Sequence, residues 1–213
     1  MDRVYIGRME DGTMAMAGIG LCVPITMVLS GLSSLFGRGG SPLAAISLGK
    51  GDREEAELFL GNSFFGLVVT SFLVMAGTLI FRKPLLTMFG ASENTMWYAS
   101  EYLTVYLYGT LFVQITVGMN YFITTQGFAK TAMITTMLGA FLNIILDPIF
   151  MFQLNMGIKG AALATVVSQM VSCVFVMWFL LGKNTKLCLR LKNMKIKKGI
   201  LTRVLVLGAS PFL

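Results

Sequence analysis

Five long apolar segments, separated by short polar stretches, dominate the pattern of the chain. They lie at residues 14–36, 58–81, 100–124, 131–152 and 157–181. A helix of about 20 apolar residues crosses the roughly 30 Å hydrocarbon core of a bilayer, so each segment predicts a membrane-spanning helix. The alternating pattern of barrel strands is not visible. We therefore expect an all-α fold, a polytopic membrane helical bundle.

The polar stretches between these segments predict loops. Residues 37–57 are rich in glycine and charge, which favours a loop that contains one short interfacial helix near residues 42–48. Residues 82–99 predict a second loop, in which Trp97 and Tyr98 are placed as interfacial aromatic residues would be. Residues 200–213 begin a further apolar segment that is too short to cross a bilayer.

Composition supports a membrane protein and excludes several kinds of active site. The chain is 55% hydrophobic and 13% charged, with a mean hydropathy of +0.76, whereas a soluble domain carries about 25% charged residues. It has no histidine, which excludes His-metal sites, Ser-His triads and histidine proton relays. Neither the phosphate-loop motif nor the HExxH motif occurs, and the three cysteines lack metal-binding spacing. We expect neither an enzyme nor a bound cofactor.

Basic residues concentrate in one stretch near the end of the chain. From Lys183 to Arg203 there are eight basic residues and no acidic one, which accounts for the net charge of +7. This local concentration predicts a solvated cytoplasmic loop, with contact to anionic lipid headgroups, and does not indicate nucleic-acid binding. With the loops assigned alternately to two sides, twelve basic residues lie on the side of this loop and five on the other. The first residues would then lie outside, from which we expect a missing helix upstream.

Asp147 is the only acidic residue deep inside an apolar segment. An ionisable side chain within a membrane span is costly, and it is a functional-site hypothesis by default. Asn143 lies one helical turn earlier, and Thr136 and Ala140 continue the same small, polar stripe. The matching stripe in the next segment consists of Ala161, Thr165, Ser168 and Ser172. The short loop between the two segments makes them antiparallel neighbours in our interpretation.

These side chains predict a cation or proton site. The carboxylate of Asp147, the carboxamide of Asn143 and the hydroxyl of Thr165 are hard oxygen ligands that suit Na⁺. Burial also favours the neutral form of a carboxylate, so Asp147 is equally suited to carry a proton. The alternative is that Asp147 is an interfacial cap at a helix start, because Pro148 follows it.

Two further features have a structural and a functional interpretation. Small residues recur every fourth position at Gly160, Ala164 and Ser168, a spacing that is typical of plain helix packing. Gln114 and Asn120 are polar residues in the third segment. Such residues mostly form hydrogen bonds between helices, and the alternative is a direct role in binding substrate or ion.

Several motifs extend across the chain. They are MDRVYIGRM, GRGGSPLAAISLGKGD, TTQGFAK, LNIILDPIFMF and MGIKGAALATVVSQ. In these motifs, and over nearly its whole length, the chain resembles the MATE (multidrug and toxic compound extrusion) transporters of the MOP superfamily. These proteins have twelve helices in two lobes, and they export drugs and organic cations in exchange for Na⁺ or H⁺.

The resemblance implies a domain organisation and a location. Residues 1–182 would form an N-lobe bundle that contains the end of helix 1 and helices 2 to 6. Residues 183–199 would be the basic cytoplasmic loop between the lobes, and 200–213 the start of helix 7 in the C-lobe. The rest of the C-lobe would be missing. The protein would reside in the cell membrane, on the family's distribution a prokaryotic inner membrane.

The resemblance also implies site residues. Asp2 resembles the family's aspartate at the outer end of helix 1, and Asn143 and Asp147 match an asparagine and an aspartate on helix 5. Thr165 matches a threonine on helix 6, and Asn120 an asparagine on helix 4. The implied function is a cation-coupled antiporter, with Na⁺ or H⁺ as the coupling ion and a drug or organic cation as the substrate.

Two other functions remain as alternatives. A flippase for a lipid-linked saccharide keeps the fold, but it tends to need cationic residues inside its cavity, and apart from Lys159, at the edge of the last long span, no lysine or arginine lies within a predicted span. The other alternative is an inactive truncated fragment, or a piece that assembles with a partner chain.

Overall fold

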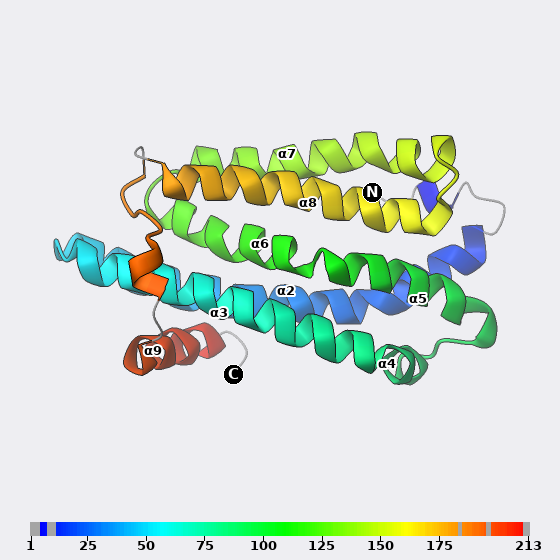
Figure 1. Ribbon diagram of the computed structural model, residues 1–213, viewed down its shortest axis with the longest axis horizontal. Coiled ribbons are helices and arrows are strands. Elements are labelled where there is room, and N and C mark those ends of the chain that lie inside the picture. Colours follow the sequence, from blue (N-terminus) through cyan, green and yellow to red (C-terminus); the bar gives the residue numbers. More distant parts are fainter. Residues whose placement is uncertain (1–4, 8–11, 183–184, 195–196, 211–213) are drawn as a thin grey trace.

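The computed structural model is a bundle of long helices that run along one axis (Figure 1). It describes residues 5–7, 12–182, 185–194 and 197–210. The helices are α2 (Gly12–Gly49), α3 (Arg53–Ile80), α4 (Arg82–Met88), α5 (Glu93–Tyr108), α6 (Thr110–Thr125), α7 (Ala129–Pro148), α8 (Gly157–Leu181) and α9 (Lys198–Ala209). A π-helical turn (Ile149–Gln153) follows α7, and a 3-10 turn (Leu191–Met194) precedes α9. The described residues contain no strand, which confirms the all-α prediction.

The helices are stacked in the order α7, α8, α6 and then α2 with α3, while α9 lies against α2 and α3 (Figure 1). Two apolar clusters form the core, one toward each end of the bundle. The first joins α2, α5 and α8 through Leu29, Leu103 and Ile158. The second joins α3, α6 and α8 through Phe59, Phe122 and Leu180, and it lies at the end of the bundle where the chain enters α9. We call this the linker end.

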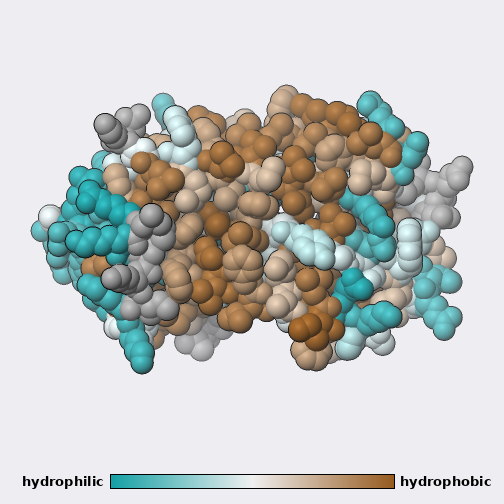
Figure 2. Space-filling model, in the orientation of Figure 1, coloured by the Kyte–Doolittle hydropathy of each residue, from teal (hydrophilic) through white to brown (hydrophobic). Residues whose placement is uncertain are grey.

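The helices have the length and hydropathy of membrane spans. Among the described residues, α2, α3, α8 and α7 with its π-helical turn each meet this criterion, and α5 and α6, bent by 58° at the break between them, meet it only when taken together. Apolar surface covers the middle of the molecule, between two hydrophilic ends (Figure 2). Four of the five predicted spanning segments are therefore helices of membrane-spanning length, and the third is divided into two helices at Gly109.

The predicted loop at residues 37–57 is wrong over most of its length, because α2 continues to Gly49 through Pro42. Glycine in this stretch serves close packing against neighbouring helices. A Cβ on Gly39 would overlap the carbonyl oxygen of Val204 on α9, and a Cβ on Gly208 would overlap that of Leu35. Tertiary contact between the two backbones therefore requires glycine where local propensity disfavours a helix. The 38 residues of α2 span about 57 Å, so α2 extends beyond a hydrocarbon core.

The predicted loop at residues 82–99 is also largely helical. It contains α4, and α5 begins at Glu93, so Trp97 and Tyr98 lie on a helix. The turn before α5 is closed by a capping box, in which the backbone N–H of Ser92 donates to Thr95 Oγ1 at 3.0 Å. Such a cap satisfies the first donors of the helix, and it allows α5 to begin before the apolar run.

Candidate cation site and the neighbouring cavity

Asp147 is fully buried, with 0% of its surface exposed, near the end of α7. The π-helical turn that follows widens the helix at this point, a feature that often occurs at functional sites. The interpretation of Asp147 as a cap at a helix start is wrong, because α7 begins 18 residues earlier, at Ala129.

Asn143 connects Asp147 to the neighbouring helix. Its Nδ2 donates to Asp147 Oδ1 at 3.1 Å and to Thr165 Oγ1, on α8, at 3.2 Å. The two helices pack extensively along their length, which holds the three side chains together. Three of the predicted site residues thus form one hydrogen-bonded cluster across α7 and α8.

The other two candidates are placed differently. Asn120, on α6, donates from Nδ2 to the carbonyl oxygen of Ala132 at 3.1 Å and to Thr136 Oγ1 at 3.4 Å. Thr136 lies seven residues before Asn143 on α7, so the two positions are about 10 Å apart along the helix axis. Asn120 therefore does not contact the cluster directly. Asp2 lies outside the described residues.

Asn120 instead lines a cavity of about 280 Å³ between α6, α7 and α8. The cavity is lined by Thr116, Val117, Asn120, Tyr121, Thr124, Thr135, Thr136, Gly139, Gln169 and Ser172. Two buried amide oxygens on this wall, Asn120 Oδ1 and Gln169 Oε1, accept no hydrogen bond from the described residues. The wall is thus rich in hydroxyl and carboxamide groups, which suits a small polar or cationic molecule.

Sequence reasoning missed Gln169 and the cavity itself. Gln169 lies one helical turn after Thr165 on α8, so its polar character within an apolar span was a usable signal. The backbone carbonyl of Gln169 accepts a hydrogen bond from Thr116 Oγ1 at 3.3 Å. Gln114 has the structural role that its position predicted, since Thr70 on α3 donates to its Oε1 at 3.3 Å.

The positively charged side chain of Arg38 lies beside the cavity, in a stretch that was predicted to be a loop. Arg38, on the extended α2, donates from Nε to the hydroxyl of Tyr121 at 3.1 Å, and its guanidinium lies 5.7 Å from the centre of that ring. Tyr121 is part of the cavity wall. Because the predicted loop at residues 37–57 is mostly helix, Arg38 lies on α2, and its side chain reaches the cavity wall.

The cluster contains one carboxylate, so its charge suits a monovalent ion. Among the described residues, no group of three or more Asp, Glu, His or Cys side chains gathers around any point. In the observed arrangement the amide nitrogen of Asn143 faces Asp147 and Thr165. Asn143 ligates a cation only if its amide oxygen faces that side, so ligation by Asn143 and the present hydrogen bonds exclude each other.

The chain is similar to a known protein family and to individual proteins within it. The sequence model of the MatE family matches residues 1–149. The chain is 29% identical over 209 residues to the multidrug export protein MepA of Staphylococcus aureus strain NCTC 8325, covering 98% of this chain and 46% of that protein. MepA of Staphylococcus saprophyticus is 30% identical over the same coverage. The chain spans about half the length of these curated relatives.

Solved structures share the fold over nearly the whole chain. A crystal structure of MATE in the bent conformation has a TM-score of 0.91 at 28% identity, covering 97% of this chain and 46% of that one. An inward-facing multidrug resistance MATE transporter of the MOP superfamily has a TM-score of 0.87 at 29% identity, covering 92% and 44%. From the family match, its helices of membrane-spanning length and this shared fold, we conclude that this multi-pass membrane chain belongs to the MatE family of transporters.

Proposed function

We propose that the chain provides the cation-binding half of an antiporter that exports drugs or organic cations in exchange for Na⁺ or H⁺. The observation that carries the proposal is the fully buried carboxylate of Asp147, which is held by Asn143 and linked to Thr165 on the next helix. Relatives of the chain are multidrug export proteins, which supports drug-like small molecules as the substrate class.

The geometry supplies a coupling step. A buried carboxylate needs either a hydrogen-bond donor, a proton or a cation to offset its desolvation. Asn143 supplies the donor in the present arrangement. If Na⁺ is bound by Asp147 and Asn143, the amide of Asn143 must turn its oxygen to the ion, and its links to Asp147 and to Thr165 across α7 and α8 are lost. A proton on Asp147 instead removes the charge and weakens the hydrogen bond from Asn143. An ion that binds one arrangement better than the other shifts the equilibrium between them.

Substrate would act on the same equilibrium from the cavity. The cavity wall includes Thr136, on the same helix as Asn143, and Gln169, on the same helix as Thr165. A molecule seated there contacts α7 and α8 between one and two helical turns from the ion cluster. Coupling of this kind is reciprocal, so substrate should alter ion affinity by the factor by which ion alters substrate affinity.

The direct test of the proposed function is to measure whether the chain itself binds Na⁺ or a proton. The purified chain in lipid nanodiscs is titrated with radioactive Na⁺ at several pH values, and proton uptake is followed in parallel. Asp147→Asn should abolish both the Na⁺ binding and the competing proton. Asp52→Asn is the matched control, because Asp52 is an exposed helix cap outside the apolar segments. Undiminished ion binding in Asp147→Asn would contradict the proposal.

Arg38 supports a second candidate, a flippase for an anionic, lipid-linked saccharide. Its guanidinium reaches the cavity wall through Tyr121 and could meet a phosphate group there. The antiporter and the flippase are distinguished by measuring the binding of a fluorescent organic cation and of a polyprenyl phosphate to the same nanodiscs. The antiporter predicts cation binding that Arg38→Gln preserves or strengthens, whereas the flippase predicts phosphate binding that Arg38→Gln removes.

A further inference from the structure

Glu57 is a buried carboxylate that binds the segment leading into α9. It lies on α3 and is 4% exposed. Arg190 contributes an ion pair at 3.3 Å, Asn193 Nδ2 donates at 3.3 Å, and the backbone N–H of Cys188 donates at 3.5 Å. Arg53, one turn earlier on α3, forms a further ion pair at 3.1 Å. The carboxylate of Glu57 thus binds three groups of residues 185–194, which we call the linker segment, and one group of its own helix.

Two carboxamides bind the same segment on either side of Glu57. Gln126, at the end of α6, accepts from the backbone N–H of Leu187 at 2.8 Å and from Thr185 Oγ1 at 2.6 Å. Asn62, on α3, accepts from the backbone N–H of Lys197 at 3.0 Å. Both carboxamides are buried. Three backbone N–H groups in irregular structure are therefore satisfied by buried side chains of the bundle, as buried backbone donors must be.

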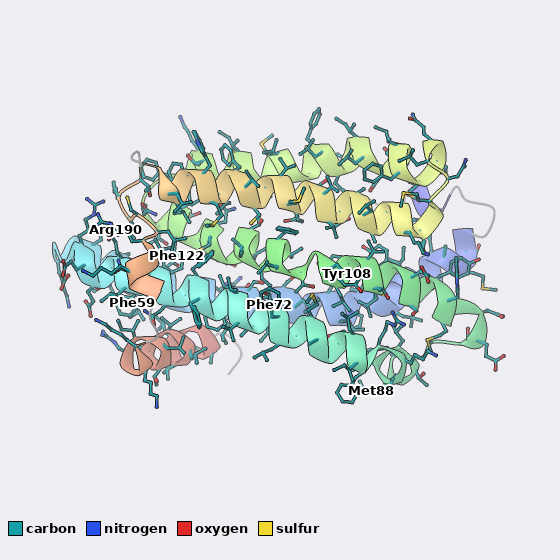
Figure 3. The ribbon with its side chains drawn as sticks, viewed as in Figure 1. Phe59, Phe72, Met88, Tyr108, Phe122 and Arg190 are labelled. Atoms are coloured by element: carbon teal, nitrogen blue, oxygen red, sulfur yellow. The ribbon has the colours of Figure 1, made fainter. Side chains whose placement is uncertain are left out.

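The apolar side chains of the segment point into the bundle. Leu187 and Leu189 are buried in the cluster at the linker end, together with Phe59 and Phe122. Arg190 lies at this same end, near the labelled Phe59 and Phe122 (Figure 3). The side chain of Arg190 is 62% exposed although it forms the ion pair with Glu57. The predicted solvated loop thus has a buried face as well as a basic surface.

α9 is held directly against the same helices. The close approach of Gly39 and Gly208 leaves no room for a side chain between α2 and α9. Arg203 forms an ion pair with Glu55 at 3.3 Å and lies 5.3 Å from the centre of the Phe59 ring. The linker segment and α9 consequently make one continuous contact with α2 and α3.

We propose that residues 185–194 and Lys197 act as a strap, which Glu57, Asn62 and Gln126 hold against the bundle so that the position of α9 is set by α3. A flexible tether would let α9 move independently of the preceding helices, whereas a strap makes the start of α9 follow the start of α3, where Glu57 and Asn62 lie. Glu57 is a positioning residue in this arrangement. The inference does not depend on the ion site, because none of its residues belongs to that cluster.

Hydrogen–deuterium exchange of the chain in nanodiscs tests the strap. The amides of Leu187, Cys188 and Lys197 should exchange slowly in the unaltered chain. Glu57→Ala should speed exchange at Cys188 by about tenfold, the effect of losing one buried hydrogen bond. Glu54→Ala is the matched control, since Glu54 is exposed on the same helical turn. Exchange at unprotected rates in the unaltered chain, or no change in Glu57→Ala, would overturn the proposal.

A second variant tests the connection to α9. The amides of Ile200 and Leu201 bond to the carbonyl oxygen of Lys197, whose own amide is held by Asn62. Asn62→Ala should therefore speed exchange in the first turn of α9 as well as at Lys197. Ser63→Ala serves as the control, because the buried Ser63 hydroxyl bonds to no described residue. Faster exchange at Lys197 with an unchanged first turn of α9 would show a tether and reject the strap.

If Glu57→Ala does not fold, Arg190→Ala gives the same information from the exposed partner. It removes the ion pair at 3.3 Å without altering the buried helix. Trypsin cleavage at Lys192 and Lys197 should become several-fold faster in this variant. A cleavage rate equal to that of the unaltered chain would count against the strap.

Discussion

Asn143 and Asp147 are joined by a hydrogen bond of 3.1 Å, one turn apart on the same helix, and the same amide nitrogen reaches Thr165 on the next helix. Asn143 thus bonds to the buried carboxylate and links two helices. Because Asn143 donates both of these hydrogen bonds, replacing it breaks both links at once.

Replacing Asn143 by Ala should destabilise the chain in the absence of ion. Asp147 would lose the donor from Asn143 in a fully buried position, and the loss of a partner for a buried charged group costs about 1–3 kcal/mol. Thermal unfolding in nanodiscs measures the effect. Saturating Na⁺ or low pH should restore part of the lost stability, because either one neutralises the carboxylate. An equal loss at every pH and Na⁺ concentration would contradict this account.

Thr165→Val and Thr165→Ser should separate the role of the hydroxyl from that of side-chain volume. Valine has nearly the shape of threonine but cannot bond to Asn143 or to an ion, whereas serine keeps the hydroxyl. We expect Na⁺ affinity to fall about tenfold in the valine variant, the effect of one lost polar contact, and to change little in the serine variant. Equal affinities in both variants would remove Thr165 from the site.

Gly39→Ala should weaken the contact of α2 with α9. The added methyl group would overlap the carbonyl oxygen of Val204, and overpacking of this kind costs about 1–3 kcal/mol. Gly20→Ala, on the same helix, has nothing within 4 Å of the new Cβ, so it should be neutral or stabilise by up to about 1 kcal/mol. Thermal unfolding of the two variants gives the comparison, and a destabilised Gly20→Ala would show that alanine is harmful throughout α2.

The effects of Gln169→Leu and Gln114→Leu on the free energy of unfolding should differ in sign or size. Gln169 Oε1 has no partner among the described residues, whereas Gln114 Oε1 accepts from Thr70. Leucine at 169 should leave stability nearly unchanged and weaken binding of an organic cation to the cavity. Leucine at 114 should cost about 1 kcal/mol. Unfolding and dye-binding titrations test both variants, and unaltered dye binding in Gln169→Leu would exclude the cavity as the substrate site.

Periodicity and composition predicted the parts of the fold that depend on transfer from water to hydrocarbon. The last long span was predicted at residues 157–181 and is α8 at the same bounds. The spacing of Asn143, Asp147 and Thr165 identified a cluster that the structure brings together. These successes share a cause, because hydropathy and the 3.6-residue period of a helix are local properties that can be counted along the chain.

The predictions that failed concern residues whose conformation depends on partners distant in the sequence. Gly39 was interpreted as part of a loop from its intrinsic preference, but it lies in a helix because α9 packs on its backbone. The contacts of Asn120 with Ala132 and Thr136 also depend on the meeting of α6 with α7, and its assignment to the ion site stays a prediction. Neither contact leaves a periodic mark in the sequence.

The sequence by itself determined that this is a bundle of membrane helices with a carboxylate in an apolar span, since the cost of exposing apolar or burying charged groups is a property of each residue. Only the tertiary structure decided that α2 extends through its glycines, that Arg38 reaches the cavity wall, and that Glu57 binds the linker segment. Those features arise where two backbones or two distant side chains meet. Their energy belongs to the pair of segments in contact, and neither segment alone reveals it.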